Sequence, residues 1–462
     1  MTLLRNLTLT LLAATSLSAC TLAPPHVRPA LPVAQAWPSP AVTVDTASAA
    51  DLDWREVFED PRLQGAISLA LSENRDLRVA VLNIERARAQ YGVQRSASLP
   101  AIGANASGVR SKTPGAPETE QYTAGVGFSA YELDLFGRVR SLNAAALQSY
   151  LATRETQRAV QISLIAETAR AWLTLAADED LLGLARDTLA SRERSLDLTR
   201  RRVEAGAGST LDLRQAQTLT EQARADVATF VAQVAQDRNA LRLVVGAEIP
   251  ADLLPAGGLV TAQILRDLPA GLPSEVLTRR PDVLAAEHQL AAASANIGAA
   301  RAAFFPRISL TGSAGTASGD LGDLFSGGGS AWSFAPQISL PIFSGGANRA
   351  GLDGARASQG IAVAQYEKAV QVAFREAADA LAVQATIDDR LGAQQRLVAS
   401  ASDSVRLSKA RNDAGLDSGL TLLDAQRTLY GAQQGLIGAR LARAGNLVTL
   451  YKALGGGASP AT

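Results

Sequence analysis

The 462-residue sequence has one cysteine and two histidines. A single cysteine excludes a disulfide within the chain and a cysteine metal site. A metal pair or serine triad that uses both His26 and His288 is not expected, because one lies in an extended segment and the other in an alanine-rich helix. The glycine runs at 327–329 and 345–346 lack the ending of a phosphate loop. We therefore expect neither an enzyme nor a cofactor.

An excess of charge is also absent, since 44 basic residues stand against 44 acidic ones. This balance gives no indication of a nucleic-acid partner. Aromatic residues make up 5% of the chain and hydrophobic residues 47%, so the core must consist largely of Ala, Leu and Val. Such a core favours long helices in close contact over one thick globular core.

Beyond the N-terminus no apolar run approaches the ~20 residues that a transmembrane helix needs. If the mature chain crosses a membrane, it must do so as strands.

The N-terminus has the layout of a secretory signal at 1–19, with a basic residue, an apolar stretch and small residues before Cys20. Its LSAC ending resembles the lipobox of bacterial lipoproteins, in which cleavage leaves the cysteine as an acylated N-terminus. Thr21 in place of aspartate implies delivery to the outer membrane. The alternative is an ordinary signal peptide with an incidental cysteine.

Two halves of the sequence resemble each other. AGAGSTLDLRQAQ at 205–217 and AGLDSGLTLLDAQ at 414–426 agree at seven positions, at an offset of 209 residues. YGVQRSASLPAIGANAS at 91–107 matches IGAARAAFFPRISLTGS at 297–313 at an offset of 206. The chain is therefore predicted to be a tandem repeat of one large unit.

Each unit predicts the same order: a helix, two strands, a long helix, a turn and another helix. Leucine and valine at seven-residue spacing favour coiled-coil packing of the long helices, with an ordinary antiparallel hairpin core as the alternative. The expected parts are a signal peptide at 1–19; an extended, lipidated segment at 20–62; a first repeat at 63–247, with helices at about 63–97, 138–204 and 210–245 and a hairpin at about 101–134; a linker at 248–272; a second repeat at 273–455, with helices at about 273–303, 348–413 and 418–454 and a hairpin at about 307–341; and a tail at 456–462.

The expected strands have about ten residues, near the length that crosses an outer membrane. Four strands cannot close a barrel, and open edges are not tolerated in lipid. Several chains must therefore combine their strands, and three chains would give about twelve, an even number within the known range.

Four motifs carry a family likeness: YELDLFGR at 131–138, RRPD at 279–282, FFPRISLTGSAG at 304–315 and LTLLDAQR at 420–427. With them the mature chain resembles the TolC-like outer-membrane efflux proteins, in the lipoprotein branch called NodT-type. The resemblance implies a mainly helical chain that forms a homotrimer, whose twelve-stranded barrel in the outer membrane continues into a long helical barrel in the periplasm. It also implies efflux of small molecules together with a periplasmic adaptor and an inner-membrane pump, expected to be proton-driven.

In this family the two helix-to-helix turns surround the periplasmic entrance, and Leu420 and Asp424 match residues that narrow it. One helical turn apart, they share a face, so threefold symmetry would give an apolar ring and a ring of three carboxylates. Taken alone, Asp424 is more typical of a solvated surface carboxylate. Asp212 and Asp417 are expected to add charge nearby, and Gln215 occupies the position of Asp424 in the first repeat.

The segments matching the adaptor-contacting tips are Ala205, Gly206, Ala207, Gly208 and Ser209 in the first repeat, and Ala414, Gly415, Leu416, Asp417 and Ser418 in the second.

Two alternatives stay open at this point. One is a protein-secretion channel of type I with the same architecture, although the lipobox favours efflux of small molecules. The other is a non-conducting coiled-coil lipoprotein tether, which would have no use for two hairpins of membrane-spanning length.

Overall fold

The computed structural model describes residues 22–25, 27–34, 36–37, 53–259, 277–326 and 329–456. Cys20 and the expected signal peptide therefore lie outside the described residues. The chain divides into two compact units. One contains the chain up to residue 30 with 82–155 and 284–369, and the other contains 31–81, 156–283 and the chain from 370 onward. Each unit draws on both sequence repeats, so the repeats are not the compact units.

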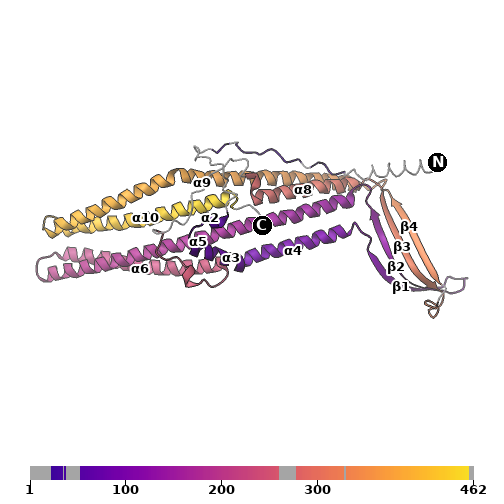
Figure 1. The fold of residues 1–462 in the computed structure, drawn as a ribbon, viewed down its shortest axis with the longest axis horizontal. Coiled ribbons are helices and arrows are strands. Elements are labelled where there is room, and N and C mark those ends of the chain that lie inside the picture. Colours follow the sequence, from indigo (N-terminus) through magenta and orange to yellow (C-terminus); the bar gives the residue numbers. More distant parts are fainter. Residues whose placement is uncertain are drawn as a thin grey trace. The chain divides into compact units, whose positions relative to one another are not determined.

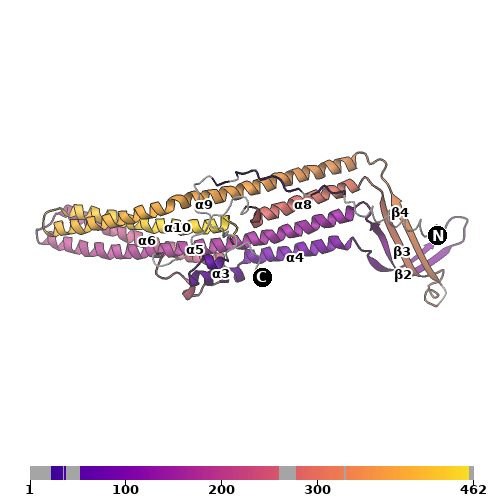
Figure 2. The ribbon, with the colours of Figure 1, turned by 45° about the horizontal axis from the view of Figure 1, so that its top comes forward.

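The first unit contains a four-stranded antiparallel sheet of strand order β1-β2-β3-β4 (Figures 1 and 2). Its strands are β1 (Ile102–Ser111), β2 (Thr119–Leu133), β3 (Arg307–Ser318) and β4 (Ser330–Ser339). β1 and β2 form one hairpin, β3 and β4 form the other, and β2 pairs with β3 between the two repeats. Within the described sheet, β1 and β4 therefore each leave one edge unpaired.

The two faces of the sheet differ in polarity. Trp332, Phe334 and Ile338 alternate along β4 and are 79%, 56% and 69% exposed. Side chains at the positions between them belong to the opposite face, where the hydroxyls of Ser333 and Ser313 lie 2.8 Å apart. One face is thus apolar and exposed, and the other is lined by small and polar groups.

Long helices continue from the strands: α4 (Arg75–Ser96) precedes β1, α5 (Arg138–Glu204) follows β2, α8 (Pro281–Ala302) precedes β3, and α9 (Ala347–Asp413) follows β4. The 67 residues of α5 correspond to about 100 Å of helix. The second unit contains α5 from residue 156 with α6 (Thr210–Val245), and α9 from residue 370 with α10 (Gly419–Ala453), as two helical hairpins. The strands and the helices α5, α6, α9 and α10 lie at the positions expected from the sequence. The helix expected at about 273–303 is corrected to α8, which begins at Pro281, and residues 273–276 lie outside the described residues.

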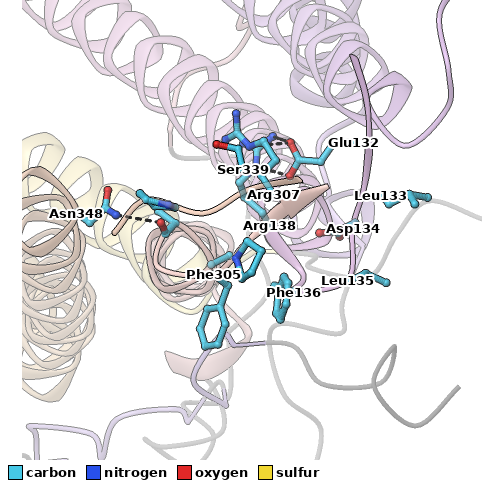
Figure 3. A pocket seen from close by; sticks show the side chains of 14 residues that line it. Glu132, Leu133, Asp134, Leu135, Phe136, Arg138, Phe305, Arg307, Ser339 and Asn348 are labelled. Atoms are coloured by element: carbon cyan, nitrogen blue, oxygen red, sulfur yellow. Dashed lines mark hydrogen bonds and ion pairs between the residues drawn. The ribbon is translucent and has the colours of Figure 1, made fainter. Parts of the chain in front are cut away.

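The corner between β2 and α5 is fixed by an acidic side chain (Figure 3). The Glu132 carboxylate accepts hydrogen bonds of 2.8 and 2.6 Å from Arg138 on α5 and lies 3.4 Å from Arg307 on β3. Phe136 and Phe305 stack with ring centroids 4.9 Å apart across the same pocket of about 250 Å³. The ELDLFGR and FFPR motifs thus meet where strands turn into helices.

The N-terminal segment of the first unit lies against α8. Arg28 binds the carboxylate of Glu287 through two hydrogen bonds of 2.9 and 2.7 Å, and Arg301 donates to the Leu22 carbonyl at 2.9 Å. A Cβ atom at Gly298 would lie 2.8 Å from the Ala23 nitrogen. Glycine at 298 therefore makes room for this segment, which we call the N-terminal strap (22–30).

Two other expectations need correction. The helix predicted at 63–97 is two helices, α3 (Pro61–Glu73) and α4, because Asn74 interrupts it. The Asn74 side chain accepts the Leu77 N–H at 2.8 Å and donates to the Val244 carbonyl at 2.7 Å, so it begins a new helix and contacts α6. The segment 20–62, predicted as extended, contains the short helix α2 (Trp54–Val57) and the start of α3.

The core of the second unit joins α2 and α3 to both helical hairpins, and Phe58 and Tyr451 meet edge to face in it. The 3-10 turn η2 (Ala251–Leu253) closes one side, where Leu253 accepts a hydrogen bond of 2.9 Å from the Trp172 indole. Many fully buried positions are alanines, among them Ala66, Ala70, Ala169 and Ala176. Small side chains let the helices approach closely, as the composition predicted.

In the part of the chain that the structure describes, no helix combines the length and the apolar character needed to cross a membrane.

Candidate functional site

The two helical hairpins close with the same turn, at one end of the second unit (Figures 1 and 2). After α5, Gly206 has φ 74° and the Ala207 N–H donates to the Arg202 carbonyl at 2.8 Å. After α9, Gly415 has φ 75° and the Leu416 N–H donates to the Arg411 carbonyl at 2.9 Å. Both are Schellman motifs, in which glycine takes the left-handed position. The repeated AG dipeptide of the sequence is therefore a repeated helix end.

The predicted tip residues occupy these turns. Ala205 to Ser209, which we call the first tip, are all exposed. In the second tip, Ala414 to Ser418, all are exposed except Asp417, which is half-buried. Leu416 is 68% exposed. Ser209 accepts the Leu211 N–H at 3.1 Å and so caps α6, with Asp212 in its first turn.

Asp417 is engaged within its own tip. Its carboxylate accepts two hydrogen bonds from the Arg411 guanidinium, of 2.7 and 2.9 Å. The hydrogen bond from Arg411 holds the pKa of Asp417 below its usual range. Gly208 occupies the corresponding position in the first tip, so that tip has no equivalent ion pair.

The predicted gate residues lie just beyond the second tip, on α10. Leu420 is 52% exposed, and Asp424 follows one turn later with a side chain that is 60% exposed. Asp424 pairs with Arg427 at 2.6 Å on the same helix. The side chains of Leu420 and Asp424 can therefore contact another chain. A ring formed by the same side chains of several copies requires such exposure.

A contact that no sequence pattern indicated joins the two hairpins. The Tyr430 hydroxyl on α10 donates to Asp226 on α6 at 3.2 Å, although the residues are 204 positions apart. Arg192 on α5, only 7% exposed, lies with its guanidinium 5.9 Å from the centre of the Tyr430 ring and donates to the Leu219 carbonyl at 3.0 Å. Burial, with the nearby Asp226, raises the pKa of Tyr430 to about 12. We call Arg192, Tyr430 and Asp226 the hairpin link.

A carboxyl pair also lies between α5 and α6. Asp237 is 9% exposed and accepts from the Gln233 amide at 3.2 Å. Burial and a hydrogen bond with Asp237 raise the pKa of Asp178 to about 7. Asp178 therefore binds a proton up to near neutral pH, at a place where α5 faces α6. The sequence showed only two separate acidic residues here.

No cluster of three or more His, Cys, Asp or Glu side chains suited to a metal ion occurs among the residues that the structure describes.

Comparison with known proteins identifies the class. Residues 66–247 and 272–456 match the family described as outer membrane efflux protein. The chain is 48% identical to the toluene efflux pump outer membrane protein TtgC of Pseudomonas putida and to the antibiotic efflux pump outer membrane protein ArpC of the same species. Each match covers 96% of this chain and 93% of the relative. The crystal structure of the open state of the MtrE outer membrane channel of Neisseria gonorrhoeae is 44% identical and superimposes with a TM-score of 0.89, over 95% of this chain and 98% of MtrE.

This chain belongs to the outer membrane efflux protein family. The predicted family and the predicted fold class, mainly helical with a small antiparallel sheet in a tandem repeat, are confirmed. The chain is the outer-membrane channel component of an efflux system, in a family of transport proteins. Of the functions that the sequence left open, efflux is the one that these relatives support.

Proposed function

We propose that three copies of this chain form a gated duct that carries small molecules out through the outer membrane, without catalysis or a cofactor. The open edges of the four-stranded sheet are the observation that carries this proposal. Unpaired strand edges cannot remain in lipid, and pairing β4 of one copy with β1 of the next removes every edge. Three copies of four strands give a barrel of twelve.

The polarity of the strands supports the same assembly. The apolar face of β4, with Trp332 and Phe334, suits lipid, and the polar face suits a water-filled interior. Ten residues at about 3.3 Å each, tilted by about 40°, span roughly 25 Å, which is the height of the apolar band of outer-membrane barrels.

The gate of the duct is proposed to lie where α10 leaves the second tip. Three copies would bring Leu420 and Asp424 into an apolar ring and an acidic ring, with Asp212 and Asp417 contributing charge nearby. Such rings hinder ion passage and favour cations. The hairpin link, which ties α10 to α5 and α6, would hold the rings in the closed arrangement.

The working partners are proposed from the family. A periplasmic adaptor would dock on the first and second tips, and an inner-membrane pump, of the proton-driven class, would supply the substrate. The relatives named for toluene and antibiotic efflux favour small apolar or amphipathic compounds. Cys20 would carry a lipid anchored in the outer membrane, and the strap, which begins two residues later at Leu22, would hold it beside the end of α8.

Native mass spectrometry and planar-bilayer recording of the detergent-purified protein test the proposal together. We expect a mass of three chains and a small cation-preferring conductance. A monomeric mass without conductance would contradict both the shared barrel and the duct, and would favour the tether.

A further inference from the structure

The first and second tips share a backbone but differ in charge. From 403 to 427, every charged side chain is in an ion pair within the same hairpin end. The four pairs are Asp403 with Arg406 at 3.2 Å, Lys409 with Asp413 at 2.9 Å, Arg411 with Asp417 at 2.7 Å and Asp424 with Arg427 at 2.6 Å. The second tip is therefore neutral and internally paired, with Leu416 as its most prominent exposed apolar side chain.

The end of α5, which leads into the first tip, carries three consecutive arginines, Arg200 to Arg202. Arg201 pairs with Asp197 at 2.9 Å. Within the described part of the chain, Arg200 and Arg202 form no ion pair, and both are exposed. Glu204 is the one acidic side chain among residues 200–209, and in the described structure it pairs with neither guanidinium, so this end of the hairpin carries an excess of positive charge.

The repeat explains the origin of this difference. Arg202 and Arg411 are equivalent, because each accepts the closing hydrogen bond of its Schellman motif. The second tip places Asp417 within reach of Arg411, whereas the first tip has Gly208 at that position and offers Arg202 no acidic partner. The first tip thus differs from the second at two positions, with Ala207 in place of Leu416 and Gly208 in place of Asp417, and the latter difference removes the ion pair.

We infer that the first tip is the charge-selective docking position, and that Arg200 and Arg202 bind an acidic side chain on the helical hairpin of the periplasmic adaptor. The second tip receives the same kind of hairpin through apolar contact with Leu416. This inference rests on the proposed function, since it assumes that an adaptor docks at the tips. Charge complementarity at such a rim acts mainly on encounter and on choice of partner.

Two matched variants distinguish the contributions of the two tips to efflux. Arg202→Gln removes a guanidinium from the first tip, and Arg411→Gln with Asp417→Asn neutralises the pair in the second tip without changing its net charge. Both would be expressed in host cells lacking the chromosomal copy, and ethidium efflux would be measured beside single-channel conductance. With Arg202→Gln we expect efflux to slow at least about threefold and the conductance to stay unchanged. With the double variant we expect efflux to change less than about twofold.

A suppressor selection identifies the partner directly. Arg202→Glu should abolish efflux, and we expect suppressors that replace an acidic residue of the adaptor hairpin with lysine or arginine. The inference would be overturned if the variants of both tips lost efflux activity equally. It would also be overturned if the Arg202→Glu protein conducted and supported normal efflux. Either result would leave the proposed duct intact. A wild-type protein that neither conducts nor restores efflux would instead refute the proposed function, and the inference with it.

Discussion

Asp178 and Asp237 make the contact between α5 and α6 sensitive to pH. Burial and the hydrogen bond with Asp237 raise the folded-state pKa of Asp178 to about 7, whereas an unfolded aspartate titrates near 4. The folded chain therefore binds more protons between these values, so stability falls as pH rises from about 4 to about 7 and is level above that range. The neighbouring Glu179 is already paired with Arg238 at 2.8 Å and does not neutralise the pair.

Asp237→Asn tests this coupling, because an amide replaces the second carboxyl group and can donate to Asp178. We expect the variant to lose most of the stability change between pH 5 and pH 8 and to be more stable than wild type at pH 8 by about 1 kcal/mol. Thermal unfolding at both pH values measures this. Asp197→Asn, at an exposed carboxylate on α5, is the control. An unchanged pH dependence in Asp237→Asn would show that Asp237 does not raise the pKa of Asp178.

The hairpin link gives a second prediction for a single residue. Tyr430→Phe removes the hydroxyl that donates to Asp226 but keeps the ring beside Arg192. We expect the free energy of unfolding to fall by about 1 kcal/mol and the open probability in planar bilayers to rise, because one tie between the hairpins is lost. Tyr366→Phe is a suitable control, since the buried Tyr366 hydroxyl has no hydrogen-bond partner in the described structure. Equal open probabilities in the two variants would remove the link from the gate.

At the scale of the element, the repeat offers a matched pair of glycines. Gly298 makes room for the N-terminal strap, whereas nothing lies within 4 Å of a Cβ atom placed on its equivalent, Gly92. Gly298→Ala should loosen the strap, so elastase should cleave after Ala30 faster. Gly92→Ala should leave that cleavage unchanged and stabilise α4 by up to about 1 kcal/mol. The strap would play no part in holding the N-terminus if both variants were cleaved at the wild-type rate.

The elements themselves were largely predictable from the sequence. Pro100 and Pro306 end helical periodicity, alternation marks the hairpins, and the length of the uninterrupted pattern after Gly137 gives α5. The break at Asn74 was missed because helical periodicity continues on both sides of it. The asparagine interrupts the helix through its contact with the Val244 carbonyl, 170 residues away, which no local pattern shows.

At the scale of the whole molecule, the sequence predicted the order of elements and the repeat, but not how they are grouped. The compact units cut through α5 and α9 and combine both repeats, because β2 pairs with β3 and the helices of both repeats share one core. The tip residues could be placed from the sequence, since a repeated glycine marks a repeated helix end. The ion pair of Asp417 and the hairpin link could not, because they depend on side-chain positions after folding.

The closed duct is a property of the assembly, and its gate is proposed to lie at Leu420 and Asp424. Leu420→Ala with Asp424→Ala would remove both proposed rings. Asp403→Ala with Leu407→Ala is a matched control on α9, because these residues are also exposed and one turn apart, and Asp403 pairs with Arg406 as Asp424 does with Arg427.

The most direct measurement is the single-channel conductance of the two double variants beside the wild-type protein, under the same salt and voltage. We predict that the Leu420/Asp424 variant conducts several times more than wild type, with weaker cation preference. The Asp403/Leu407 variant should have wild-type values. Wild-type conductance and selectivity in the Leu420/Asp424 variant would contradict a gate at this position.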